Sequence, residues 1–352
     1  MKQNNYILNF IKVTFISLLL IATSPVRAEI KVVTTIKPLH SLIANVMDGV
    51  GEPSLIIEGS TSPHSFTLKP SHAKLLEEAD LIFWVGEGIE TFMERPLESI
   101  VKNAEVVEFM EVESIEKLKF REESIFGDHD DHDDHDDHDE DHDDHDDHDD
   151  HDEDHDDHDD HDDDHDDHDD HDDHDDHAGH EGHNHGEFDA HIWLDPSNAK
   201  EMVHEIAHEL GDLDPANKDK YEANAEATII ALDQLIKDVS KDINKDAKFV
   251  VFHDAYQYFE ERFGVRAAGA LTLNTDVLPG AKQIDEIQDV IKDRGINCIF
   301  SEPQFNPKII STIAEDTNIK TGVFDPLGAN INSDKDLYFK LISNLGNELK
   351  GC

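Results

Sequence analysis

Residues 30–49, IKVVTTIKPLHSLIANVMDG, join a strand pattern directly to a helix pattern. The first six residues are rich in β-branched types, and Pro38 then stands where the first turn of a helix tolerates proline. Until Gly49 stops the pattern, apolar residues recur with the period of an amphipathic helix, at Leu39, Leu42, Ile43, Val46 and Met47. A strand followed by a covering helix is the repeating unit of a parallel sheet.

The same alternation continues along the chain. A first group of strands is expected at 54–58, 80–85 and 105–109, with helices at 71–79 and 90–101. A second group is expected at 248–252, 265–270, 297–301 and 320–324, with helices at 255–263, 281–294, 307–317 and 335–349. These groups predict an α/β fold of two lobes, each with a parallel sheet flanked by helices.

Two helices are expected between these groups. One covers 197–210, and Asp214-Pro215 then offers a cap and a first-turn proline for a longer one that reaches Ile243. At the helical rise per residue the longer one would span about 45 Å, enough to join the lobes as a rigid connector. The expected boundaries are an N-terminal lobe at 29–213, a linking helix at 214–243 and a C-terminal lobe at 244–352.

The first 28 residues have the pattern of a secretory signal. Lys2 precedes an apolar run at 13–21, and Val26-Arg27-Ala28 provides a small-residue cleavage site. The run is much shorter than the roughly 20 residues that a membrane-spanning helix needs. We therefore expect a soluble protein of the bacterial periplasm whose mature chain begins near Glu29.

The segment 128–177 consists only of 34 acidic residues and 16 histidines, mostly as an Asp-Asp-His repeat. It carries −34 of the formal charge of −54, so the rest is ordinarily acidic and nucleic acid is not an expected partner. The repeat has no apolar side chain to bury, so 128–187 should form a disordered loop. Its histidines and carboxylates can still collect zinc, but weakly, because ordering the chain costs roughly 1–2 kcal/mol per residue.

Only two cysteines occur, Cys298 and the terminal Cys352. In an oxidising compartment a disulfide is the simple interpretation. A structural zinc site is the weaker alternative, because two isolated cysteines lack the paired spacing of such sites.

Four potential metal ligands stand beside strand-like segments. His64 lies beyond 54–58, and His191 opens the segment HIWLDP. His253 and Asp325 directly follow the expected strands at 248–252 and 320–324. Ligands of open α/β sheets bind at the carboxyl ends of the strands. Three imidazoles and one oxygen form a tetrahedral set suited to Zn²⁺ rather than to Mg²⁺ or Ca²⁺.

Several segments resemble the metal-binding proteins of bacterial ABC importers for zinc and manganese, specifically their ZnuA-type zinc branch. They are GSTSPHSFTLKPS at 59–71, DLIFWVG at 80–86, DAHIWLDPSNA at 189–199, FHDAYQYF at 252–259, SEPQFNP at 301–307 and FDPLGAN at 324–330. The resemblance implies two lobes of parallel sheet joined by a rigid helix, with the metal between them and little hinge motion. It also implies a monomer that delivers zinc to a membrane permease.

Position by position, the resemblance places zinc ligands at His64, His191 and His253. Manganese relatives look to carry a carboxylate at the position of His253, so an imidazole there favours zinc. Some zinc relatives use a glutamate beside the first histidine, but Pro63 stands there in this chain. The fourth ligand is then Asp325 or a water, with Glu58 as a distant alternative. The two cysteines also match a disulfide of the zinc branch, and an acidic, His-rich insert is typical of it.

Rival interpretations belong to other functional classes. His204-Glu205-Ile206-Ala207-His208 matches the H-E-x-x-H signature of zinc proteases. Helical periodicity, however, places its two histidines opposite the apolar stripe of 197–210, facing water. A three-histidine zinc site can also hydrate or hydrolyse, but no separate acid, base or substrate pocket can be assigned. A manganese or iron importer component and a periplasmic zinc buffer are the remaining alternatives.

Overall fold

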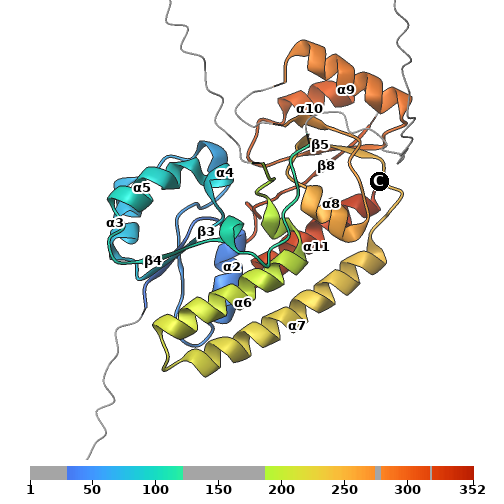
Figure 1. Cartoon of the computed structure of the whole chain (residues 1–352). Helices are drawn as coiled ribbons and strands as arrows, with labels where there is room; N and C mark the ends of the chain where they lie inside the picture. The colour runs from blue at the N-terminus through green and yellow to red at the C-terminus, as the bar shows by residue number, and fades with distance from the viewer. Residues whose placement is uncertain (1–29, 122–186, 274–278, 318) are drawn as a thin grey trace, which may run out of the picture. The chain divides into compact units, whose positions relative to one another are not determined.

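The computed structural model describes residues 30–121, 187–273, 279–317 and 319–352 (Figure 1). The expected signal at 1–28 and the expected loop at 128–187, except its last residue, lie outside the described residues. Within the described residues, no helix has the length and apolar character needed to cross a membrane.

The first sheet has four parallel strands in the order β2-β1-β3-β4. Their bounds are β1 Val32–Thr34, β2 Ser54–Leu55, β3 Leu81–Trp84 and β4 Glu105–Glu108. Strand β2 is therefore shorter than the strand that the apolar pattern predicts at 54–58. The helices between these strands include α2 Lys37–Val46 and α3 Pro70–Glu78.

The prediction of a single helix near 90–101 is wrong. The chain instead forms α4 Glu87–Glu90, a 3-10 turn η2 at Thr91–Met93 and α5 Glu94–Ser99. Pro96 explains the break, because its ring clashes with a carbonyl four residues earlier and it has no N–H to donate. Proline is tolerated only near the start of a helix, so the helix begins again at Glu94.

The second sheet is also parallel, in the order β6-β5-β7-β8. Its strands are β5 Phe249–His253, β6 Ala270–Thr272, β7 Cys298–Ser301 and β8 Lys320–Val323. Strand β6 begins at the last residue of the range expected for it, 265–270, and continues two residues beyond that range. The helices of this sheet are α8 Gln257–Phe263, α9 Ala281–Asp293, α10 Lys308–Thr317 and α11 Leu337–Lys350. Two parallel four-stranded sheets flanked by helices confirm the predicted two-lobed α/β fold.

Two long helices, α6 Pro196–Leu213 and α7 Lys218–Asp242, run side by side (Figure 1). The prediction that α7 starts at Asp214-Pro215 is wrong. Asp214 instead ends α6, and its carboxylate accepts a hydrogen bond from the Asn217 side chain at 2.6 Å. The 25 residues of α7 span about 37 Å rather than the expected 45 Å. This helix contacts α2 as well as α8 and α11.

A buried lysine ties the start of α2 to a turn that follows β8. The Lys37 ammonium donates to the carbonyls of Gly328, Ala329 and Ile331, at 2.5 to 3.1 Å. The left-handed backbone of Gly328, with φ of 68°, lets this turn close. Replacing the lysine would take a donor from the partly buried carbonyls of Ala329 and Ile331, whereas the Gly328 carbonyl would keep the Ile331 N–H. The contact therefore holds the 328–331 turn against the start of α2.

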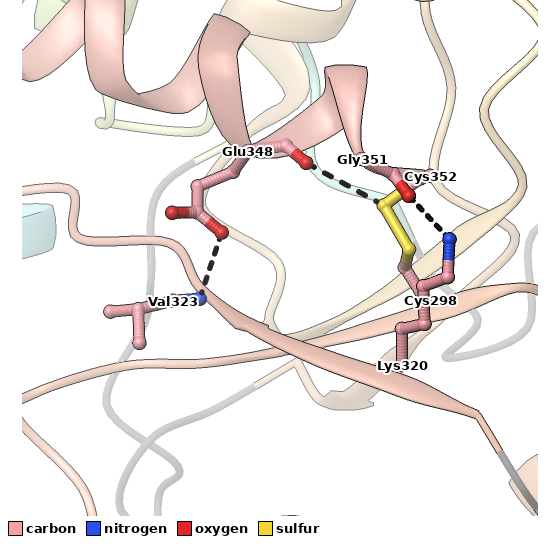
Figure 2. Close-up of a disulfide and its surroundings, with 6 residues drawn as sticks. All are labelled: Cys298, Lys320, Val323, Glu348, Gly351 and Cys352. Carbon is pink, nitrogen blue, oxygen red and sulfur yellow. Dashed lines mark hydrogen bonds between the residues drawn. A yellow bond between two sulfur atoms is a disulfide. The ribbon is translucent and has the colours of Figure 1, made fainter.

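A disulfide joins Cys298, the first residue of β7, to Cys352 at the C-terminus (Figure 2). The expected pairing is thereby confirmed. Beside it, the Lys320 ammonium donates to the Gly351 carbonyl at 2.8 Å. Cys298 pairs with Phe249 at the start of β5, whereas the candidate ligand His253 ends that strand, about 13 Å further along.

We predict that opening this disulfide lowers stability without abolishing metal binding. Closing a loop of 54 residues stabilises the fold by about 4 kcal/mol in the chain-entropy model. Melting curves of the oxidised protein and of Cys298→Ser should differ, while a zinc titration should still give one tight site. Equal melting temperatures, or two free thiols in protein isolated from the periplasm, would contradict this prediction.

Candidate metal centre

Three histidines that are distant in sequence come together in the fold. His64 lies in the 3-10 turn η1, Pro63–Ser65, and His191 directly precedes the 3-10 turn η4, Ile192–Leu194. His253 is the last residue of β5. One ring nitrogen from each lies within 4.8 Å of the others, the only such group of three potential ligands in the described part of the chain.

Local sequence explains how each imidazole is presented. Proline begins η1, because its fixed φ suits the first residue of a turn, and the next residue is His64. His253 ends a fully buried parallel strand, so its side chain stands at the carboxyl edge of the second sheet. His191 and His253 are buried, and His64 is half-buried.

Two buried carboxylates stand behind two of the imidazoles. Asp189 Oδ1 lies 2.7 Å from His191 Nδ1 and accepts the backbone N–H of the same histidine at 3.0 Å. Glu302 Oε1 lies 2.6 Å from His253 Nδ1. A carboxylate at Nδ1 holds the ring proton there, so the lone pair of Nε2 is left for a metal.

The two Nε2 atoms face each other at 3.3 Å. This is a hydrogen-bond distance, and the donor depends on the tautomers of the two rings. Nitrogens bound to one tetrahedral zinc lie about 3.3 Å apart, because each bond is about 2.0–2.1 Å long. The spacing therefore fits two ligands of a single ion.

Electrostatics favour an uncharged His191. Burial, and then the nearby charge of His253, hold its pKa well below the usual value. Burial alone would lower the pKa of His253, but the charge and hydrogen bond of Glu302 outweigh it and raise that pKa. Burial raises the pKa of Asp189 to about 7. A neutral imidazole is the metal-binding form, so His191 can ligate without first losing a proton.

The cavity at the histidines is small. Its walls include Trp193, Gln304, Phe305, Pro326 and Leu327, and its volume is about 10 Å³. That is about the space in which one water molecule fits. A space of this size can accept an ion.

Asp325, the fourth expected ligand, lies outside the three-histidine group. Its carboxylate accepts the backbone N–H groups of Leu327, Gly328 and Ala329, at 2.6 to 3.2 Å. The Gln304 amide donates to it as well, at 3.0 Å. These hydrogen bonds allow Asp325 to stabilise the turn at 327–329. The two residues that follow Asp325, Pro326 and Leu327, line the cavity. Glu58, the distant alternative, is exposed and also outside the group.

The H-E-x-x-H histidines of α6 point away from the core, as expected. His204 and His208 are exposed and line an open groove between α6 and α7. The opposite stripe is buried, at Ala199, Met202, Val203, Ile206, Ala207 and Leu210. These two histidines therefore lack the walled cleft that a zinc protease needs.

Comparison with known proteins shows the same fold and family. A family model described as the periplasmic component A of the zinc-uptake complex matches residues 32–352. The high-affinity zinc uptake system protein ZnuA of Brucella abortus is 48% identical, over 91% of each chain. This chain belongs to the ZnuA family.

Solved structures with this fold include a crystal structure of ZnuA, with a TM-score of 0.65 and 20% identity. It covers 91% of this chain and 98% of that one. A crystal structure of a zinc-bound ZnuA deletion mutant has a TM-score of 0.64 and 20% identity, over 91% of this chain and 98% of that one. At this identity the likeness concerns the fold, and here it covers both lobes.

The two carboxylates behind the imidazoles, Asp189 and Glu302, were not predicted from sequence. Glu302 directly follows β7, so the strand-end rule that selected His253 would have selected it too. Asp189 stands two residues before His191, close enough for a short local contact. Which carboxylate contacts which imidazole, however, can be seen only in the three-dimensional structure.

We predict that His253→Ala weakens zinc binding strongly, whereas His204→Ala leaves it almost unchanged. Even the loss of a residue behind a ligand costs about 10–100-fold in metal affinity, so the loss of a ligand should cost more. His204→Ala is the matched control, because it removes an exposed histidine from α6. Competition titration against a chelator measures both variants, and the reverse order of affinities would refute the assignment.

Proposed function

We propose that this chain captures Zn²⁺ in the periplasm and delivers it to the membrane permease of an ABC zinc importer. One observation carries the proposal: three imidazole nitrogens converge on a cavity of about 10 Å³, and two of the rings are held by buried carboxylates. The site has the size of an ion and the ligands of zinc. Membership of the zinc-uptake family supports the same conclusion.

Zinc is favoured over manganese and iron by the donor atoms. We assign His64, His191 and His253 as ligands, with Asp325 or a water in the fourth position. Asp325 Oδ2 accepts one backbone N–H, from Ala329, so it keeps a lone pair with which it could bind a metal without breaking the 327–329 turn. A set dominated by nitrogen suits zinc, whereas manganese and magnesium prefer oxygen.

Ligand capture fits the site better than catalysis. A three-histidine zinc enzyme needs an open position and space for substrate beside the metal. Here aromatic and aliphatic side chains close around an ion-sized space. We therefore assign no catalytic residue, and the chain acts as a binding protein rather than as an enzyme.

The remaining proposals concern export and organisation. We propose that 1–28 is a cleaved secretory signal and that the mature protein is a periplasmic monomer. We further propose an N-terminal lobe at 29–213, a linking helix at 214–243 and a C-terminal lobe at 244–352. The contacts of α7 with α2, α8 and α11 support a connecting role for this helix.

Uptake measurements distinguish a transport component from a zinc buffer. In a bacterium that lacks its own zinc-binding component but carries the cognate permease, the intact chain should restore zinc accumulation at low zinc. His253→Ala should fail and His204→Ala should succeed, at matched periplasmic amounts. A chain that binds zinc tightly but never stimulates uptake would support the buffer function instead.

The acidic, His-rich segment generates a separate prediction. We propose that it collects zinc at sites weaker than the three-histidine centre, because each ion there must order the chain that binds it. Deleting 128–186 should lower the number of zinc ions bound, measured by calorimetry and native mass spectrometry, while one tight site remains. Loss of the tight site, or an unchanged number of ions, would refute this role.

A further inference from the structure

We propose that Arg121 is a positioning residue for the metal centre: it fixes the segment that carries Asp189 and so holds His191 in its ligating orientation. The inference rests on the proposed zinc site. Arg121 is the last described residue before 122–186, and its guanidinium pairs with Asp254 and Glu260. Its effect on the metal centre passes through these carboxylates and through the segment that carries Asp189.

Arg121 belongs to a short two-stranded ribbon. Lys119 and Phe188 form an antiparallel bridge, and the Asp189 N–H donates to the Leu118 carbonyl at 2.8 Å. Arg121 follows the first segment of this ribbon by two residues, and the second segment leads directly into His191. A displacement of the first strand is thus transmitted to the residue that supports an imidazole.

A buried tyrosine pins both strands of the ribbon to α8. The Tyr258 hydroxyl accepts the Leu118 N–H at 2.9 Å and donates to the Asp189 carbonyl at 2.6 Å. The main chain of Asp189 is consequently held on two sides. Its carboxylate is then in place to accept from His191.

Arg121 anchors the same ribbon by charge. Its guanidinium pairs with Asp254, with Nε 2.9 Å from Oδ2, and with Glu260, with Nη1 2.8 Å from Oε2. A second nitrogen, Nη2, contacts both carboxylates as well. The side chains of Asp254 and Glu260 are each only 4% exposed. Such planar, two-point pairing fixes the orientation of the guanidinium as well as its distance from the carboxylates.

The position of these carboxylates links the anchor to the metal centre. Asp254 directly follows His253, and Glu260 lies on α8 near Tyr258. Without the guanidinium, two buried negative charges would face each other without a counter-charge, which is strongly unfavourable. The structure would relax by moving the ribbon, the start of α8 or both. Either movement shifts a support of His191 or His253.

A matched arginine separates positioning from general stability. Arg262 also forms a two-point ion pair, with both nitrogen–oxygen distances to Asp195 at 2.7 Å. Asp195, however, caps α6 through the Ser197 N–H, and its carboxylate pairs with Arg262 rather than with an imidazole. Removing either guanidinium should destabilise the protein, but only the loss of Arg121 should change the metal centre.

The experiment compares Arg121→Met, Arg121→Lys and Arg262→Met in the full mature chain, with Glu302→Gln as the reference for a disturbed centre. Three quantities are measured: the melting temperature of the metal-free protein, zinc affinity by chelator competition, and the visible spectrum after Co²⁺ replaces zinc. The cobalt bands report ligand geometry, which a purely structural defect elsewhere would leave unchanged.

We expect Arg121→Met to weaken zinc binding about tenfold or more and to alter the cobalt spectrum, as the loss of other outer supports does. Arg121→Lys should recover part of the affinity, since one ammonium restores charge but not the two-point geometry. Arg262→Met should lower the melting temperature only. If Arg121→Met does not fold, Arg121→Lys must still show the weaker affinity and the altered spectrum.

Zinc affinity and a cobalt spectrum that remain those of the unaltered protein in Arg121→Met, or in Arg121→Lys where the former does not fold, would overturn the inference. Equal losses of affinity in Arg121→Met and Arg262→Met would overturn it too, because the effect would then be general. Failure of the zinc site itself gives a different result. In that case Glu302→Gln and His253→Ala would also bind zinc with unaltered affinity.

Discussion

The Nε2 atoms of His191 and His253 lie 3.3 Å apart, and a buried carboxylate holds each ring from its far side. Asp189 and Glu302 accept from the Nδ1 side of the two rings, which directs both Nε2 atoms into the cavity. A divalent cation that binds both nitrogens would replace the proton between them and would be attracted by the two carboxylates. This pair of supported imidazoles therefore favours a metal ion.

The fold creates this arrangement from parts that are far apart in sequence. A parallel sheet brings His253 to the carboxyl end of β5, and η4 and η1 supply His191 and His64. Hydrogen bonds between distant segments then hold the frame. The Lys37 ammonium fixes the 328–331 turn, and the Trp193 indole N–H donates to the Pro326 carbonyl at 2.8 Å. A frame fixed in this way needs little ordering when the ion arrives, which favours tight binding.

Charge balance gives the centre its specificity for a cation. Asp189, Asp254, Glu260 and Glu302 are all buried near the two imidazoles, and Arg121 is the cation that pairs with two of them. A bound zinc ion offsets part of the remaining negative charge. Imidazole nitrogens of the candidate site favour zinc over metals that prefer oxygen, and the buried carboxylates behind them favour a doubly charged occupant.

The alternation of strands and helices could be predicted from sequence, because apolar periodicity and proline positions act within short segments. The sequence also indicated His64, His191 and His253, since strand ends and the family resemblance both point to them. The break at Pro96 and the later start of α7 show where local patterns were too coarse. Which groups meet is set by the three-dimensional fold: Glu302 with His253, Asp189 with His191, and Arg121 with Asp254. The fold also adds to the prediction for Asp325, whose carboxylate accepts backbone N–H groups of the 327–329 turn. Such pairings depend on distances through space between segments remote in sequence, and no periodicity along one chain encodes those distances.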